Sequence, residues 1–195
     1  ETEVLVHVEG AVRDLLAGSS LPIVLLRRRA VGEGDSPDGL TRAPSVAHDL
    51  PELGVMLPYT PLQHLLLAAA SSHGMHALVM TSGNLSEEPI ETDDALAWEH
   101  LVAAGIADAL LGNDRAILSR YDDSVVRVVD GTVMPVRRAR GYAPQPLSLP
   151  ARDGTAPDVL ACGPQPKATI ARPRERAEGP VAHCAAHTLG EGDTG

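Results

Sequence analysis

The stretch ALVMTSGN (residues 77–84) predicts a buried strand, Ala77 to Met80, that runs directly into a polar loop, Thr81 to Asn84. Glycine lets the backbone approach a ligand closely, and ligands of open α/β sheets bind at the carboxyl ends of the strands. An ordinary polar turn explains the same residues, because Ser, Gly and Asn are common in turns. On the pattern alone, the turn is favoured over a binding loop.

The segments before this stretch alternate between strand and helix patterns. Apolar runs rich in β-forming residues lie at 3–9 and 21–27, and residues 11–17 between them predict a short helix. A short strand is predicted at 54–58. Thr60 and Pro61 are typical of a helix N-cap and first turn, and the wide apolar face up to Ala70 predicts a largely buried helix.

The segments after it predict a helix and a hairpin. The helix begins near Thr92 or Asp93 and ends at Gly105. Asp130-Gly131 between two apolar runs, 124–129 and 132–136, is a strong hairpin signal. Strands that alternate with helices, together with an antiparallel hairpin, predict an α/β domain with a mixed sheet.

A second candidate site lies where RYDDSVVR (120–127) faces RRARGY (137–142) across the predicted hairpin. Arginine forks and a hydroxyl could clamp a triphosphate, and the two carboxylates could hold magnesium. Cross-strand ion pairs on a solvated face are the commoner explanation of such a pattern. His73 with His76, and His183 with His187, have spacings compatible with a metal, but no further ligands accompany them clearly enough to predict a site.

Composition excludes several classes of protein. The net charge of −10 excludes a globally basic nucleic-acid binder, and the absence of Phe removes most aromatic platforms for stacking bases. The two cysteines, Cys162 and Cys184, form no disulfide framework and predict reduced thiols in a cytoplasmic protein. The uncharged stretch 53–86 is interrupted by Pro and polar residues, so no membrane helix is expected.

Several long stretches resemble the later part of the YrdC-like domain of the HypF carbamoyltransferases, which mature nickel–iron hydrogenases. They are PIVLLRRR (22–29), LGVMLPYTPLQHLLL (53–67), LVMTSGNLSEEPI (78–90), IADALL (106–111), RYDDSVVRVVDG (120–131) and RRARGYAP (137–144). The resemblance implies a YrdC-like α/β fold with a twisted mixed sheet and flanking helices. It also implies a fragment that lacks the N-terminal part of that domain.

The same resemblance implies a domain division. Residues 1–150 would form the C-terminal part of the YrdC-like domain, and residues 151–158, rich in Pro, would form a linker. VLACGPQPKATI (159–170) resembles the opening of a TsaD-like carbamoyl-transfer domain. Residues 159–195 are therefore predicted to be the truncated start of that domain or an irregular tail, since the last 25 residues show no clear periodicity.

The resemblance implies an enzyme that forms carbamoyl adenylate from carbamoyl phosphate and ATP, with Mg²⁺. The carbamoyl group would pass to the C-terminal cysteine of a HypE-type acceptor protein. By position, Ser82 and Asn84 would contact the nucleotide or its acyl-phosphate part. Ser124, with Arg138 or Arg140, would hold the phosphates. No residue is assigned as catalytic.

Three alternatives stay open. The chain could be a threonylcarbamoyl-adenylate synthase of tRNA modification, which uses threonine and bicarbonate in place of carbamoyl phosphate. It could be a YrdC-like module that binds double-stranded RNA, although the charge of −10 argues against strong non-specific binding. The isolated fragment could also be inactive, because an incomplete sheet exposes an apolar edge.

Overall fold

The computed structural model of the chain describes residues 3, 5–29, 43, 45–86, 88–118, 120–150, 159–162, 169–176 and 179–184. The chain forms two compact units. Unit 1 comprises Glu1–Met80 and Asp123–Arg137, and unit 2 comprises Thr81–Asp122 and Arg138–Gly195. The predicted linker, residues 151–158, lies outside the described residues, and the predicted domain boundaries stay a prediction.

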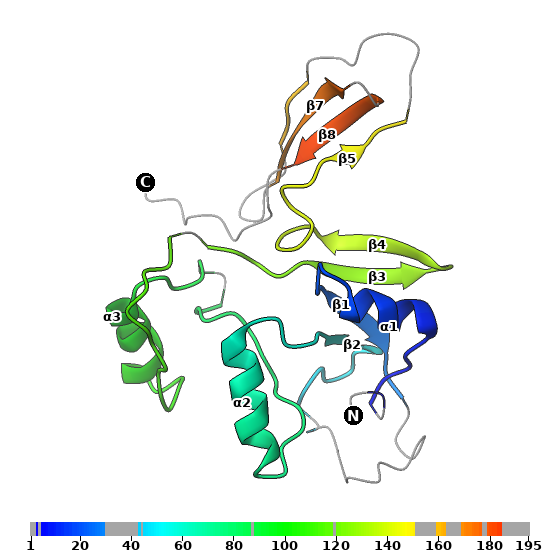
Figure 1. Cartoon of the computed structure of the whole chain (residues 1–195). Coiled ribbons are helices and arrows are strands. Elements are labelled where there is room, and N and C mark those ends of the chain that lie inside the picture. Colours follow the sequence, from blue (N-terminus) through cyan, green and yellow to red (C-terminus); the bar gives the residue numbers. More distant parts are fainter. Residues whose placement is uncertain are drawn as a thin grey trace. The chain divides into compact units, whose positions relative to one another are not determined.

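Unit 1 is built on a four-stranded mixed sheet in the order β2-β1-β3-β4. The strands are β1 (Ile23–Arg27), β2 (Glu52–Val55), β3 (Val125–Val129) and β4 (Thr132–Arg137). β1 runs antiparallel to β2 and parallel to β3, and β3 runs antiparallel to β4 (Figure 1). The predicted mixed α/β architecture is therefore confirmed.

The β3–β4 hairpin forms where the sequence predicts it. Asp130 and Gly131 both have positive φ, 49° and 74°, which is the backbone conformation that a two-residue type I′ turn needs. Glycine reaches this region without strain, and aspartate tolerates it better than most residues. The turn chemistry thus sets the register of the two strands.

The core of unit 1 lies between the sheet and α1 (Gly10–Ala17). Val12 and Leu16 face inward from the helix, and Val24 and Val126 are fully buried on neighbouring strands. The apolar run at 3–9 forms less regular strand structure than its composition predicts. Its Val6 forms a single bridge with Arg28, and Val4 lies outside the described residues.

The helix α2 (Pro61–Ser71) begins as predicted, but it is not largely buried. Thr60 accepts a hydrogen bond from the Gln63 backbone N–H, and the Gln63 side chain accepts one from the Thr60 N–H, which completes a capping box. Of the eleven residues only Gln63 and Ala70 are buried, and Leu65 is 69% exposed. The wide apolar face of a helix becomes buried only when another element packs against it.

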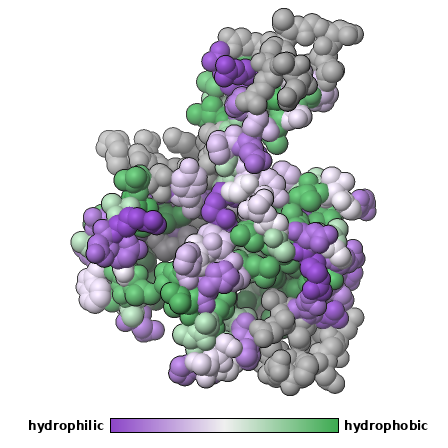
Figure 2. Space-filling view, viewed as in Figure 1, coloured by the Kyte–Doolittle hydropathy of each residue, from purple (hydrophilic) through white to green (hydrophobic). Residues whose placement is uncertain are grey.

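Residues Ala77–Met80 are the second correction, because they form neither a strand nor part of the core. Val79 is 78% exposed. Hydrophobic residues are visible at the surface of the described residues, between hydrophilic ones (Figure 2). A strand needs neighbours for its backbone N–H and C=O groups, and none of the described strands pairs with this segment. An apolar run therefore was not sufficient evidence for a buried strand.

Unit 2 contains a short helical segment and a small antiparallel sheet. The helix α3 (Asp94–Ala97) continues as the π-helix η2 (Trp98–Ala103), and the predicted cap Asp93 accepts hydrogen bonds from the Ala95 and Leu96 N–H groups. The predicted helix start is thus correct.

The sheet of unit 2 has the order β5-β8-β7-β6. Its strands are β5 (Leu147–Ser148), β6 (Ala161–Cys162), β7 (Ile170–Arg176) and β8 (Gly179–Cys184). Strands β7 and β8 lie in the last 25 residues, where the sequence shows no clear periodicity. Pro173 masks the strand signal, but β6 pairs with β7 only at residues 170 and 171, so the missing N–H of Pro173 interrupts no β6–β7 bond.

Thr60→Ala is expected to lower the free energy of unfolding by about 1 kcal/mol, because the Gln63 N–H loses its partner at the start of α2. Urea unfolding followed by far-UV circular dichroism measures the change. Thr60→Ser keeps the hydroxyl and should restore most of the stability. Equal midpoints for wild type and Thr60→Ala would show that this cap does not stabilise the helix.

Candidate functional site

The loop Thr81–Asn84 is held by its own amide side chain and by the segment that follows it. Asn84 Nδ2 donates to the carbonyl oxygens of Leu85 and Glu88 at 2.7 and 3.0 Å. The Glu91 N–H donates to the Gly83 carbonyl at 2.9 Å. These bonds close residues 83–91 into a compact turn that leaves Ser82 exposed.

Asn84 keeps one unused acceptor inside this turn. Its Oδ1 is buried and has no hydrogen-bond partner in the described part of the chain. Buried polar groups are usually paired, so an unpaired acceptor at a candidate site is a feature that a ligand donor could satisfy. The side chain therefore has a structural donor and an available acceptor.

Arg138 is turned toward the backbone of the next turn. Its Nη2 donates to the carbonyl oxygens of Tyr142, at 2.6 Å, and of Gln145. Its Nε and Nη1 are buried without a hydrogen-bond partner among the described residues. Arg140 lies two residues on, and its N–H donates to the Asp122 carbonyl at 3.2 Å. Arg138 thus orders the Tyr142–Gln145 turn.

Ser124 lies in unit 1, at the start of β3, and its exposure is 0%. Its carbonyl accepts a hydrogen bond from the Ile23 N–H at 2.8 Å, which joins β3 to β1. The neighbouring Asp123 accepts a hydrogen bond from the Tyr59 hydroxyl at 3.1 Å. The other four predicted site residues, Ser82, Asn84, Arg138 and Arg140, lie in unit 2.

A strap formed by Ile90 and Glu91 joins the two candidate sequences inside unit 2. Arg120 Nε donates to the Ile90 carbonyl at 2.7 Å, while the Glu91 N–H holds Gly83. The Glu91 carboxylate binds His100 Nδ1 at 2.6 Å. Sequence reasoning missed this strap. Nothing in the spacing of Glu91 and His100 along the sequence indicates their contact.

The strap supplies the main electrostatic feature of unit 2. The pKa of His100 is raised above 6.5, first because the ring hydrogen-bonds the Glu91 carboxylate and also because Glu99 and Glu88 lie near. Burial raises the pKa of the Tyr142 hydroxyl.

In unit 1, the Arg127–Glu52 pair raises the pKa of the arginine through a hydrogen bond. Arg127 on β3 therefore forms an ion pair with Glu52 on β2, across the intervening strand β1.

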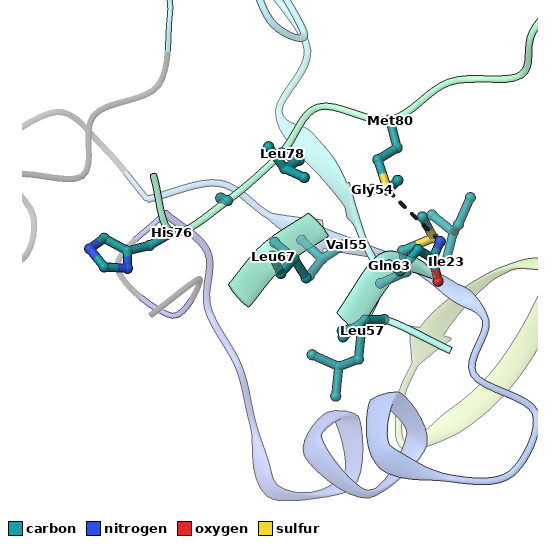
Figure 3. Close-up of a pocket in the computed structure, with 12 residues that line it drawn as sticks. Ile23, Gly54, Val55, Leu57, Gln63, Leu67, His76, Leu78 and Met80 are labelled. Carbon is teal, nitrogen blue, oxygen red and sulfur yellow. Dashed lines mark hydrogen bonds between the residues drawn. The ribbon is translucent and has the colours of Figure 1, made fainter. Parts of the chain in front are cut away.

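Described residues line a pocket in each of the two units. In unit 1 a cavity of about 360 Å³ lies between β2, the start of α2 and residues 76–80. Gln63 and Met80 meet there, with Gln63 Nε2 3.9 Å from the Met80 sulfur, while the His76 ring points away (Figure 3). In unit 2 a cavity of about 550 Å³ is lined by Gly83, Glu91 and several further acidic side chains.

The described residues give no support to a built metal centre. No group of three or more His, Cys, Asp or Glu side chains there could hold a metal ion. His73 Nδ1 lies 3.0 Å from the Ala69 carbonyl, and His187 is outside the described residues. Cys162 and Cys184 are free thiols, as predicted. In the described part of the chain, no helix has both the length and the apolar character needed to cross a membrane.

Residues 4–139 match the model of the Sua5/YciO/YrdC family, whose description is "Telomere recombination". This match spans more than half of the chain. The chain belongs to the Sua5/YciO/YrdC family. The resemblance to a YrdC-like domain that the sequence indicated is therefore confirmed.

This YrdC-like chain is also similar to curated carbamoyltransferases. It is 48% identical over 166 residues to carbamoyltransferase HypF of Rhodobacter capsulatus, covering 85% of this chain and 20% of the relative. It is 47% identical over 170 residues to HypF2 of Cupriavidus necator, with 80% and 20% covered. The probable HypF of Methanocaldococcus jannaschii is 32% identical, with 76% and 18% covered. The chain thus spans about a fifth of the length of these relatives.

Two solved structures agree with the YrdC-like assignment. Full-length HypF in the phosphate- and nucleotide-bound form matches with a TM-score of 0.72 at 34% identity, covering all of this chain and 27% of that chain. HypF from T. kodakarensis matches with a TM-score of 0.73 at 27% identity, covering 99% and 22%. The predicted resemblance to HypF is confirmed by both kinds of comparison.

Proposed function

We propose that the chain is the nucleotide-binding part of a HypF-type carbamoyltransferase. The observation that carries this proposal is its similarity, over its full length, to a HypF structure in the phosphate- and nucleotide-bound form. The carbamoyltransferase relatives at 32–48% identity support the same family of reactions. Activity, substrates and partners of the whole protein are inferred from these relatives.

The proposed reaction joins two anions, so its main requirement is charge stabilisation. Water first hydrolyses carbamoyl phosphate to carbamate and inorganic phosphate, and a carbamate oxygen then attacks the α-phosphorus of ATP. The bond to the β-phosphate oxygen breaks, pyrophosphate leaves, and carbamoyl adenylate remains. A protein accelerates such a step by aligning the reactants and placing donors at the developing negative charge. Backbone N–H, hydroxyl and guanidinium groups are suitable donors.

The predicted site residues take different roles in this proposal. Ser82 is exposed and offers its hydroxyl to the nucleotide, while Asn84 holds the loop and presents its unpaired Oδ1. Arg140 is the candidate for the phosphates. Arg138 supports the turn beside it, because Nη2 is committed to two backbone carbonyls. Ser124 is proposed to support the junction of β1 and β3, because its carbonyl accepts the Ile23 N–H.

Magnesium is proposed to arrive with ATP. Mg²⁺ usually keeps several waters and binds through one or two carboxylates plus substrate phosphates. Because the described residues contain no three-ligand cluster, we assign the ion no protein ligand and no step in the reaction. We also propose, from the same resemblance, that the acceptor is a HypE-type protein and that the protein acts in the cytoplasm.

The test is exchange of labelled pyrophosphate into ATP by the purified chain. Exchange that depends on carbamoyl phosphate is the expected result. Exchange with threonine and bicarbonate instead would support the second candidate, a threonylcarbamoyl-adenylate synthase. No exchange from a folded, monodisperse sample would contradict the proposal that this chain itself activates the substrate. Retention of double-stranded RNA that falls steeply with salt would support the RNA-binding alternative.

A further inference from the structure

We propose that Glu91 and His100 are a positioning pair that fixes the Thr81–Asn84 loop for nucleotide binding, a role that rests on the proposed function above. The pair connects the loop to the α3–η2 helical segment through one residue. Glu91 holds Gly83 with its backbone N–H and His100 with its carboxylate, at 2.9 and 2.6 Å. Glu91 therefore links the backbone bond that closes the loop to the side-chain contact with His100.

The loop has few other anchors. Asn84 bonds to carbonyl oxygens inside the same turn, those of Leu85 and Glu88, so it shapes the turn without attaching it to another element. Attachment comes from the strap, where Ile90 accepts from Arg120 and Glu91 reaches His100. The strap thus connects the loop to Arg120 and to η2.

The helical end of the connection is well held. Asp93 caps α3 by accepting hydrogen bonds from Ala95 and Leu96, and η2 continues directly from α3. His100 lies within η2, and its ring is 37% exposed, whereas the Glu91 carboxylate is only 13% exposed. The Glu91 carboxylate is shielded from solvent, and the His100 ring is more accessible. The contact is stronger when the ring is protonated, because a positive charge then faces the carboxylate.

The sign of the pH dependence follows from the charges that face the ring. Glu91 across the contact, Glu88 from the turn and Glu99 from η2 itself are all acidic. They raise the pKa of His100 above its ordinary 6.5, so the protonated ring is favoured in the folded chain. The stabilisation is complete below pH 6.5 and is lost as the pH rises through the raised pKa.

Hydrogen exchange of the Glu91 amide tests the pair without any enzyme activity. In the wild-type chain, protection of this amide, corrected for intrinsic exchange, should fall about two- to fivefold between about pH 5.5 and about pH 8.5. His100→Gln can still donate to the carboxylate but does not titrate, so its protection should be intermediate and independent of pH. His100→Leu should show low protection at every pH.

His48→Gln is the matched control, because it removes another exposed histidine–carboxylate pair, His48–Asp49, in unit 1. It should leave the Glu91 amide unchanged. Persistence of the pH dependence in His100→Gln, or equal protection in all variants, would overturn the proposal. If His100→Leu does not fold by far-UV circular dichroism, His100→Gln still decides the question.

Binding of Mg-ATP separates positioning from simple stabilisation. The dissociation constant of the wild-type chain should rise about two- to fivefold over the same pH range, and that of His100→Gln should not. A wild-type chain that binds ATP equally well across this range would overturn the positioning role. A chain that binds no ATP at any pH would contradict the proposed function, while the exchange result would still report on the Glu91–His100 contact.

Discussion

Val126→Asp should unfold unit 1. Val126 has 0% exposure and lies on β3, next to Val24 of β1, which is equally buried. A carboxylate at this position has no partner, and an uncompensated buried charge costs about 3–5 kcal/mol. Small domains are stable by only about 5–15 kcal/mol, so this substitution removes much or all of the margin. Loss of the urea transition in far-UV circular dichroism is the expected observation.

Val136→Asp is the matched control on the adjacent strand β4. Its side chain is 60% exposed, so the same carboxylate stays solvated there. The expected change in unfolding free energy is within about 1 kcal/mol, which reflects the weak strand propensity of aspartate. Equal destabilisation by the two substitutions would contradict the assignment of β3 to the centre of the sheet.

Asn84→Ala should reduce the pyrophosphate exchange supported by carbamoyl phosphate about a hundredfold. The substitution removes the Nδ2 bonds to the Leu85 and Glu88 carbonyls, and with them the shape of the loop that carries Ser82. It also removes the unpaired Oδ1 that we assign to the ligand. Loss of one correctly placed group at a reacting centre typically costs about a hundred- to a thousandfold in rate.

Asn113→Ala provides the comparison for this variant. Asn113 is an exposed asparagine of unit 2 whose Oδ1 accepts one local hydrogen bond, from the Arg115 N–H at 2.8 Å. Asn113 lines the same unit 2 cavity as Gly83, but its Oδ1 is already paired with the Arg115 N–H, so the exchange activity of this variant should stay within about twofold of wild type. Full activity in Asn84→Ala would remove this loop from the proposed site.

Local signals in the sequence were reliable where the bonds that satisfy them are local. The Thr60 cap, the helix start at Asp93 and the Asp130-Gly131 turn each form within about four residues, and each agrees with the prediction. The long motif stretches also identified the family, because ordered matches over many residues are specific. The sequence by itself was therefore enough to predict where these two helices begin, where the hairpin turns and which family the chain resembles.

Burial and long-range contacts were decided only by the tertiary structure. Residues 77–80 and α2 are apolar enough for a core, yet they are exposed because no described element of unit 1 covers them. The contact between Glu91 and His100 depends on how the turn after Asn84 brings the strap to η2. Composition states how a residue would behave if it were covered or paired, whereas packing and backbone hydrogen bonding decide whether it is.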